Sequence, residues 1–383
     1  MAETMKPLYI LQACGSRSWG GLEMEAVKTA LGLQDRGHSV ALACPPGSML
    51  ETASEEKGLR VYGVLDGYKK PVSSMRRTMQ LLRSARWDIV HTHLSHDLSI
   101  LTPALGLTHH GAKLFLTKHM ASGIKKTTIV HMLLYRRLES IFTISNYIRG
   151  SVLNTCPVPP RSVFVLHNGI DLSRYDPQTA RADHLRERYG ISRQDTVIGM
   201  VGRVSRGKGH REFIRASAEL TKRISRGLKF VVVGGSSYGE ESLFEEMKSF
   251  GKRYLPDDKL IFTGQQDNIP EFLSLFDILA FPSHEESFGN VLLEAMAMRV
   301  PVIACDSGGV PDIVTPGTGL LIPPRDHEAL CEALSRCITD TGLAHELSEA
   351  GRKRVETYFT LERHIDRLLD HYYGKAQADP LTG

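Results

Sequence analysis

Short apolar segments alternate with amphipathic helical patterns along almost the whole chain. Residues 22–36 show the helical pattern, because Met24, Val27, Leu31 and Leu33 recur at near-helical spacing. The candidate strands of the first half are PLYILQA, SVALACP, RVYGV, DIVHTHL, KLFLTKH, SIFTISN and SVFVLHN. Strands that alternate with helices predict parallel sheets covered by helices, since each parallel connection must cross over the sheet.

The same alternation restarts after the polar segment DPQTARADHLRERYG, with candidate strands TVIGMVG, KFVVVGG, KLIFTGQ, DILAFPS, VPVIACD and GLLIPP. The 383 residues therefore predict two doubly wound, Rossmann-like α/β domains, residues 1–178 and 188–356. Ligands of such domains bind at the carboxyl ends of the strands. We expect the helix at 360–374 to pack back on the first domain, and residues 375–383 to form a disordered tail.

Composition narrows the class of protein further. The six Cys residues show no CxxC pair and no zinc-finger spacing, which favours free thiols over a disulfide framework. The N-terminal apolar segment has no basic region before it, so we expect a buried strand there and no signal peptide. No window approaches about 18 consecutive apolar residues, and we expect no membrane span. These features predict a cytoplasmic protein.

Glu294 interrupts an apolar run in SHEESFGNVLLEAMAM, residues 283–298. Burying an unpaired carboxylate costs several kcal/mol, so its presence needs a reason. Glu286 stands eight positions earlier, and residues 287–290 mark a helix start. If most of those positions are helical, the rise between the two residues is about 12 Å. One carboxylate could then bind a hexose and the other a ribose, across a diphosphate; the alternative is that Glu294 is a buried ion-pair partner.

Two glycine-containing loops follow predicted strands. CGSRSWGGLEMEA places Gly20 and Gly21 before a helix, where backbone N–H groups can approach a phosphate, although a plain tight turn fits as well. GMVGRVSRGKGH brings Arg203, Arg206 and Lys208 together among glycines. Converging cations in an open loop suit a diphosphate; a solvated basic turn is the alternative.

With these segments in view, the chain resembles the family 4 retaining glycosyltransferases, which carry a Glu-x7-Glu motif and have the GT-B fold of two Rossmann-like domains facing a cleft. Glu286 and Glu294 match the motif. The resemblance also rests on WGGLE, DIVHTHL, HNGIDLSRYDP, GRVSRGKGH, SGGVPDIV and GLLIPPRD, and so covers nearly the whole chain. Within the family, it is similar to bacterial lipopolysaccharide-core and glycolipid glycosyltransferases.

The resemblance implies roles for particular residues. Arg203 and Lys208 would bind the donor diphosphate and neutralise the leaving group, while Glu286 contacts the donor sugar. His119 matches a family histidine beside the anomeric carbon, and we count it as catalytic with those three. The residues that the resemblance implies for donor binding are Gly20, Gly21, Gln265, Ser287, Phe288, Gly289, Asn290 and Glu294, the last on the ribose.

A retaining, front-face mechanism suits this set of residues, since in it the leaving phosphate takes the acceptor proton and no carboxylate has to attack. Catalysis then rests on charge stabilisation and positioning. The chain contains no Asp-x-Asp, so we expect neither a metal nor another cofactor. The three histidines of HTHLSHD (His91, His93 and His96) are possible ligands of a transition metal, but we favour a role in lining the acceptor cleft.

Charge is concentrated in the first half of the chain. Residues 1–175 hold 21 Lys/Arg and 12 Asp/Glu, a net charge of +9. Most of the excess lies in residues 68–86 and 118–149, where Met and Leu interleave with the cations. That pattern favours an anionic membrane surface or glycolipid, contacted by Lys125, Lys126, Arg136 and Arg137; a solvated basic face is the alternative. We expect no nucleic-acid partner, because no binding module is recognisable.

The sequence therefore predicts a retaining glycosyltransferase that moves a sugar from a nucleotide sugar, preferably a UDP-sugar, to a lipid-linked or lipopolysaccharide-core acceptor. We expect it at the inner face of the cytoplasmic membrane. A soluble small-molecule acceptor is the first alternative, and a GT-B-like nucleotide-sugar epimerase is the second. A non-enzymatic nucleotide-sugar sensor or scaffold is a third.

Overall fold

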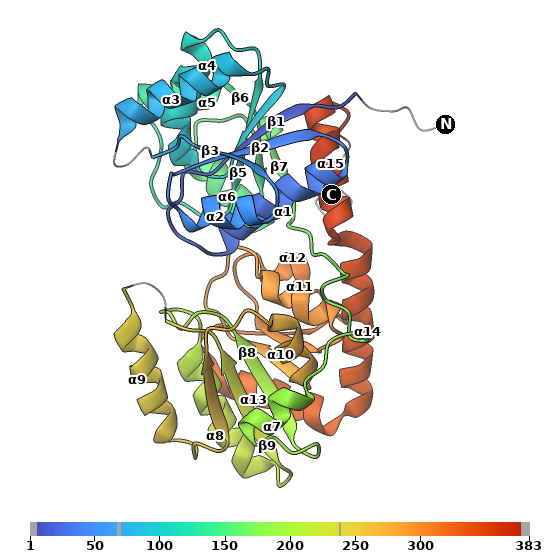
Figure 1. Cartoon of the computed structure of the whole chain (residues 1–383). Helices are drawn as coiled ribbons and strands as arrows, with labels where there is room; N and C mark the ends of the chain where they lie inside the picture. The colour runs from blue at the N-terminus through green and yellow to red at the C-terminus, as the bar shows by residue number, and fades with distance from the viewer. Residues whose placement is uncertain (1–5, 67–69, 237–238, 377–383) are drawn as a thin grey trace. The chain divides into compact units, whose positions relative to one another are not determined.

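The computed structural model describes residues 6–66, 70–236 and 239–376 (Figure 1). The chain divides into two compact units, Met1–Asn168 with Leu361–Gly383, and Gly169–Thr360. Of the predicted tail, residues 377–383 lie outside the described part. Each unit contains one sheet, and all strand pairs within both sheets are parallel.

The first unit is built on a seven-stranded sheet with the order β3-β2-β1-β4-β5-β6-β7. Its strands are β1 (Tyr9–Ala13), β2 (Ser39–Cys44), β3 (Arg60–Gly63), β4 (Ile89–Thr92), β5 (Lys113–Lys118), β6 (Leu138–Thr143) and β7 (Val163–Val165). Six of the seven candidate strands of the first half contain one of them, and the remaining one, SIFTISN, overlaps β6, which begins two residues earlier at Leu138; these strand predictions are confirmed. The helices are α1 (Gly21–Asp35), α2 (Met49–Glu56), α3 (Pro71–Ser84), α4 (Leu98–Leu107), α5 (Ile129–Arg136), α6 (Asn146–Thr155) and α15 (Leu361–Tyr373), with short 3₁₀ turns at Ser95–Asp97 and Pro160–Ser162.

Helix α15 completes the core of the first unit, although almost two hundred residues separate it from β7. Its apolar face packs with residues of β1, α1, β5 and β6, and the α15 members of this cluster are Ile365, Leu368, Leu369 and Tyr372. Gly32 of α1 permits a close approach, because a Cβ there would lie 2.7 Å from Ile365 Cγ1.

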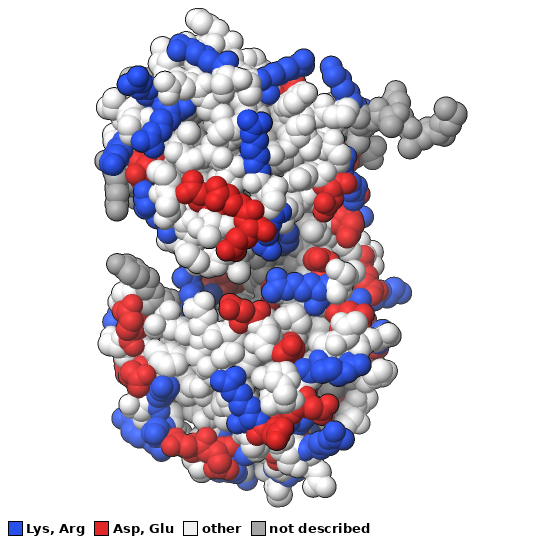
Figure 2. All heavy atoms as spheres, viewed as in Figure 1, with Lys and Arg blue, Asp and Glu red and all other residues white. Residues whose placement is uncertain are grey.

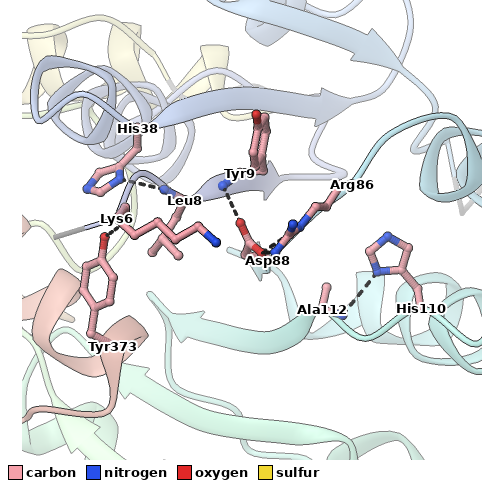
Figure 3. Close-up of polar contacts among 9 residues, drawn as sticks. All are labelled: Lys6, Leu8, Tyr9, His38, Arg86, Asp88, His110, Ala112 and Tyr373. Atoms are coloured by element: carbon pink, nitrogen blue, oxygen red, sulfur yellow. Dashed lines mark hydrogen bonds and ion pairs between the residues drawn. The ribbon is translucent and has the colours of Figure 1, made fainter.

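The end of α15 is also tied to the start of β1 (Figure 3). The Tyr373 hydroxyl donates a hydrogen bond of 2.5 Å to the Lys6 carbonyl. The neighbouring backbone is held by His38, whose Nδ1 accepts from Leu8 N at 3.2 Å, and by Asp88, which accepts from Tyr9 N at 2.9 Å. These contacts lie at the edge of the sheet where the strands begin.

The second unit is built on a six-stranded sheet with the order β10-β9-β8-β11-β12-β13. The strands are β8 (Thr196–Val201), β9 (Leu228–Val233), β10 (Leu260–Gly264), β11 (Ile278–Phe281), β12 (Val302–Cys305) and β13 (Leu320–Ile322). Each lies within a predicted segment except β9, which begins one residue before KFVVVGG. The helices are α7 (Asp183–Tyr189), α8 (His210–Arg223), α9 (Glu241–Lys252), α10 (Ile269–Leu275), α11 (Asn290–Ala297), α12 (Val310–Ile313), α13 (His327–Thr339) and α14 (Thr341–Tyr358). One large apolar cluster joins β8, β9 and β11 to α8 and α13.

The predicted end of the first domain at residue 178 is too late, because residues 169–178 belong to the second unit. Ile170 forms a β-bridge with Thr360, and Arg352 of α14 donates a hydrogen bond to the Tyr175 carbonyl at 3.0 Å. A turn-rich segment such as SRYDP carries no periodic apolar signal, so its partner could not be read from sequence.

Two further expectations concern thiols and membranes. All six cysteines are buried and free, as their spacing predicted. Among the helices in the described ranges, none has the length and apolar character needed to cross a bilayer.

Candidate functional site

The loops that follow β8 and β11 form the centre of the candidate site in the second unit. These strands are neighbours at the point where the strand order reverses, so their following loops lie at the same edge of the sheet. His284 N donates to the Gly207 carbonyl at 2.7 Å and joins the two loops. Gly209 has a φ of +79°, and a Cβ there would lie 2.0 Å from the Pro282 carbonyl oxygen. This close approach requires glycine.

Lys208 and Glu286 meet where the two loops join. The Lys208 Nζ lies 2.5 Å from Glu286 Oε2, and the two side chains are 30% and 18% exposed. Ser283 Oγ donates to the same carboxylate oxygen at 3.4 Å. The structure therefore brings together a cation and a carboxylate that lie 78 positions apart in the chain.

A third loop holds the backbone of Glu286. Gly309 N donates to the Glu286 carbonyl at 2.8 Å, and a Cβ on Gly308 would lie 2.1 Å from that oxygen. Gly308 has a φ of +58°, so both its conformation and its neighbour favour glycine. The SGGVPDIV segment thus fixes the position from which the Glu286 side chain extends.

Arg203 differs from Lys208 in its surroundings. Its side chain is exposed, and no hydrogen bond or ion pair joins it to another described residue. Glycines at 202 and 207 keep the loop open, with φ values of +151° and +80°. A guanidinium placed beside the carboxyl end of β8 without a carboxylate partner keeps its charge available for an anion.

Helix α11 begins at Asn290, after Gly289 with a φ of +104°. Only half of the steps between Glu286 and Glu294 are therefore helical, so the mostly helical path on which the estimate of about 12 Å depended is not present. The N-terminus of α11 still follows directly on the loop that carries Glu286.

Glu294 is half-buried and accepts a hydrogen bond from Tyr175, a residue that the sequence analysis did not single out. Burial, together with the adjacent Glu294 carboxylate, raises the pKa of the Tyr175 hydroxyl well above its usual value. Tyr175 is therefore a neutral donor at physiological pH. The predicted ion-pair alternative overlooked this hydroxyl.

The other predicted donor-binding residues differ in accessibility. Gln265 is exposed just after β10, at the same edge of the sheet as the Lys208 loop, whereas Ser287 and Asn290 are half-buried. Phe288 is only 2% exposed, and its ring centroid lies 6.2 Å from that of Phe359. The Phe288 side chain thus belongs to the core, while its backbone lies at the start of α11; its assignment to the donor stays a prediction.

In the first unit, Gly20 and Gly21 stand at the start of α1. Gly20 is the extended N-cap residue, with a φ of −172° that any residue adopts. A Cβ on Gly21 would meet nothing within 4 Å, so packing within the chain does not require glycine there. The carboxylate of Glu23 is buried in the first turn, close to Gly20. This acid occupies part of the positive end of the helix.

His119 lies directly after β5, at the carboxyl edge of the first sheet, and is 7% exposed. Its Nε2 lies 3.0 Å from Nδ1 of His93, and the two rings are stacked at 5.3 Å. Burial lowers the pKa of His119 well below its usual value and that of His93 to about 3, so both rings are neutral.

The structure also places His91 on β4 and His93 directly after it. Their rings are stacked, with centroids 5.0 Å apart. His91 is 1% exposed, so its predicted role in lining an acceptor cleft is wrong. Within the described ranges, no three His, Cys, Asp or Glu side chains are grouped as metal ligands.

The basic stretch around α5 has fewer free cations than its composition indicated. Lys126 turns inward, with Nζ 3.7 Å from Cys156 Sγ, and Arg137 donates to the Ala112 carbonyl at 2.8 Å. Local acceptors therefore hold these two half-buried side chains, and their part in the expected four-cation surface stays a prediction. Lys125 and Arg136 are exposed.

Large apolar side chains are exposed beside these cations. We call this surface the α5 patch; its members are Met120, Ile124, Ile129, Val130, Met132 and Leu133. A groove of about 650 Å³ lies nearby along α3 and α4, lined mainly by apolar side chains with Arg76 and Arg83 among them. Helix α4 contacts both α3 and α5, so the groove and the patch belong to one side of the unit. Figure 2 shows mainly Lys and Arg among the charged side chains over these helices.

Comparison with known proteins agrees with the fold and the motifs. Residues 182–354 match the family model described as "Glycosyl transferases group 1", and residues 19–174 match "Glycosyltransferase Family 4". The structure of HepE from Anabaena in complex with UDP and glucose superimposes with a TM-score of 0.83, at 21% identity, covering 96% of this chain and all of that one. The predicted GT-B fold is confirmed.

Two curated relatives illustrate the range of the similarity. A D-inositol 3-phosphate glycosyltransferase of Salinispora arenicola is 34% identical over 245 residues, 60% of this chain and 53% of the relative. A GDP-mannose-dependent alpha-(1-6)-phosphatidylinositol monomannoside mannosyltransferase of Mycobacterium tuberculosis is 30% identical over 241 residues, 60% of each chain. These matches span little more than half the length of the relatives. With both family models matched in sequence order and the Glu286–Glu294 motif in place, the chain belongs to the family 4 glycosyltransferases.

Proposed function

We propose that this protein is a retaining glycosyltransferase that transfers a sugar from a nucleotide-sugar donor, preferably a UDP-sugar, to a lipid-linked or lipopolysaccharide-core acceptor. The observation that carries the proposal is the Lys208–Glu286 pair at the carboxyl ends of β8 and β11, with the exposed Arg203 on the same loop as Lys208 and without an ion-pair partner among the described residues. The UDP and glucose bound in the structure of HepE support the donor class.

The donor diphosphate fits the cationic side of this site. Lys208 and Arg203 supply two positive charges, and the N-terminus of α11 supplies backbone N–H groups. Charge-assisted hydrogen bonds to phosphate are the strong ones, and they strengthen as negative charge builds up on the leaving group. The preformed pair with Glu286 holds Lys208 in place before the donor arrives.

The two carboxylates suit the two sugars of the donor. Glu286 accepts hydrogen bonds from hydroxyls of the transferred sugar, and Glu294 accepts them from the ribose. Because Tyr175 already donates to Glu294, that carboxylate is oriented before the nucleotide binds. Ser287, Asn290 and Gln265 complete the donor contacts in this proposal, and in the first unit Gly20, Gly21 and His119 do so, as the family resemblance implies.

The transfer itself requires no enzyme nucleophile. The acceptor hydroxyl oxygen bonds to the anomeric carbon as the bond from that carbon to the phosphate oxygen breaks. The acceptor proton passes to a phosphate oxygen, the nucleoside diphosphate leaves, and the anomeric configuration is retained. Positioning and neutralisation of the departing charge carry the catalysis, so we propose that neither a metal nor another cofactor takes part.

A lipid-linked acceptor is supported by the first unit. The α5 patch, the apolar groove, and the exposed Lys125 and Arg136 together suit an anionic membrane surface. One relative is named for a phosphatidylinositol monomannoside substrate. We therefore propose peripheral attachment at the cytoplasmic face of the membrane. The soluble alternative has support in the relative named for D-inositol 3-phosphate.

The direct test is a transfer assay with a panel of UDP-, GDP- and ADP-sugars. We expect acceptor-dependent release of a nucleoside diphosphate, unaffected by EDTA, and NMR of the product should show the anomeric configuration of the donor. An inverted linkage would overturn the retaining assignment, and EDTA inactivation reversed by Mg²⁺ or Mn²⁺ would overturn the metal-free one. A modified nucleotide sugar formed without acceptor would favour the epimerase.

Arg203→Ala and Lys208→Ala are each expected to lower kcat about a hundredfold, because each removes a charge-assisted contact to the leaving group, worth about 3 kcal/mol. Arg203→Ala should leave the Tm unchanged, since Arg203 has no partner among the described residues. Lys222→Ala, an exposed residue near the far end of α8, is the matched control for loss of a cation. Near-wild-type turnover in both site variants would contradict the assignment of Arg203 and Lys208 to the donor diphosphate.

Glu294→Ala is expected to weaken UDP binding about tenfold or more, as loss of a hydrogen bond to a charged group predicts, and calorimetry measures it. Tyr175→Phe should weaken binding less, and should have no further effect in the Glu294→Ala background, because it acts through that carboxylate. Tyr254→Phe, at a half-exposed tyrosine, serves as the control. Unchanged affinity of Glu294→Ala with an unchanged Tm would contradict the ribose role.

Membrane attachment is expected to depend on anionic lipid and salt. The protein should co-sediment with phosphatidylglycerol vesicles and not with phosphatidylcholine, and attachment should weaken as salt screens the charges. The double reversal Lys125→Glu/Arg136→Glu should lower partitioning at least tenfold, at about 1 kcal/mol per cation. Lys222→Glu, in the other unit, is the control. Equal partitioning to both lipids, or none to either, would favour the soluble acceptor.

A further inference from the structure

Six buried side chains of the first unit form one continuous hydrogen-bonded chain that ends at His119. In order, the chain runs Thr117, His91, Tyr372, Gln12, His93 and then His119. Thr117, His91 and Gln12 lie on β5, β4 and β1, Tyr372 lies on α15, and His93 and His119 directly follow β4 and β5. On the His91 side, Thr117 Oγ1 lies 2.8 Å from His91 Nε2, and His91 Nδ1 lies 2.6 Å from the Tyr372 hydroxyl oxygen. That oxygen lies 3.3 Å from Gln12 Nε2. On the His119 side, Gln12 Oε1 lies 2.9 Å from His93 Nε2, and His93 Nδ1 lies 3.0 Å from His119 Nε2.

The direction of each hydrogen bond follows from Gln12. Its amide oxygen carries no hydrogen, so His93 Nε2 must donate to it. A neutral His93 then has a bare Nδ1, which accepts from His119 Nε2. His119 is thereby fixed with its hydrogen on Nε2 and a lone pair on Nδ1.

The other side of Gln12 is consistent with the same assignment. The amide NH₂ donates to the Tyr372 oxygen, so the Tyr372 hydroxyl is free to donate to His91 Nδ1. His91 Nε2 then donates to Thr117 Oγ1. Reversing the amide would reverse every donor along the chain, so a single group sets the tautomers of three histidines.

We infer that His93, Gln12 and Tyr372 are positioning residues that hold His119 as a neutral Nε2–H tautomer, with its bare Nδ1 offered as an acceptor to a substrate hydroxyl. The role of His119 toward substrate rests on the proposed function; its tautomer does not. Nδ1 of His119 has no hydrogen-bond partner among the described residues, whereas Nε2 is occupied by His93.

The surroundings of His119 keep it neutral. Its ring is buried, and the titratable groups that face it are His93 just after β4, His364 on α15, Lys118 on β5 and Lys28 on α1. All four are cationic or potentially so, and each opposes a positive charge on His119. As a result the pKa of His119 lies well below its usual value, and the ring accepts a hydrogen bond without acting as an acid.

The tautomer is measured directly by two-dimensional NMR on protein labelled with ¹⁵N-histidine, with His119 assigned by comparison with His119→Gln. We expect the ¹⁵N chemical shifts of His119 to show a protonated Nε2 and an unprotonated Nδ1 throughout pH 6–8. An Nδ1–H tautomer or an imidazolium ring at pH 7 would overturn the inference. Because this reading needs no substrate, it stands whether or not sugar transfer is found.

Kinetics test whether the residues act through His119. His93→Phe, which keeps a stacked ring, is expected to lower kcat about tenfold, as the loss of one well-aligned hydrogen bond predicts. In the His119→Ala background the same change should have no further effect, whereas a structural role would lower kcat in both backgrounds. If His93→Phe does not fold, Gln12→Met replaces it in the same cycle. Equal effects in the two backgrounds would overturn the positioning role.

Two adjacent tyrosines of α15 provide the matched control. Tyr372→Phe removes the hydroxyl that holds the Gln12 amide and should lower kcat several-fold. Tyr373→Phe removes a hydroxyl that bonds to the Lys6 carbonyl instead (Figure 3) and should leave kcat unchanged. Equal turnover of the two variants would contradict the part assigned to Tyr372.

Discussion

The hydrogen-bonded pairing of β8 with β11 determines most of what the second unit can do. Both strands are buried along their whole length, and the chain leaves them for different neighbours on either side. Their following loops must therefore separate just beyond the sheet, which leaves backbone and side chains free to face a ligand. Glycines at positions 209 and 308 let the loops approach closely enough for Lys208 to reach Glu286.

The first unit follows the same topology but places different chemistry at its strand ends. β1 and β4 are the neighbours at its reversal point, and Gln12 and His93 lie on or just after them. Here the polar groups are neutral, buried and mutually hydrogen-bonded, whereas the second unit presents charged groups that are partly exposed. One unit thus offers fixed charge, which suits a diphosphate, and the other offers fixed hydrogen-bond direction, which suits hydroxyls.

The strands and the Lys208–Glu286 neighbourhood could be predicted because a parallel sheet collects its carboxyl ends at one edge. Contacts between segments that lie far apart in the sequence could not be predicted. Tyr175 sits in a turn without periodicity, and Gln12 meets Tyr372 across 360 positions of sequence. A count of charges likewise cannot show that Lys126 turns toward Cys156, because the direction of a long side chain depends on acceptors that only the fold supplies.

The return of α15 to the first unit has a consequence for synthesis of the protein. Residues 169–360 emerge from the ribosome between the first sheet and the helix that covers it. At 5–20 residues per second, this interval of roughly 190 residues lasts about 10–40 s. Throughout that time the apolar face later covered by Leu368 and Leu369 lacks its partner, and Gln12 lacks the Tyr372 hydroxyl. The unit whose translation begins first is therefore completed last, and a nascent chain holds an open first sheet while the second unit folds.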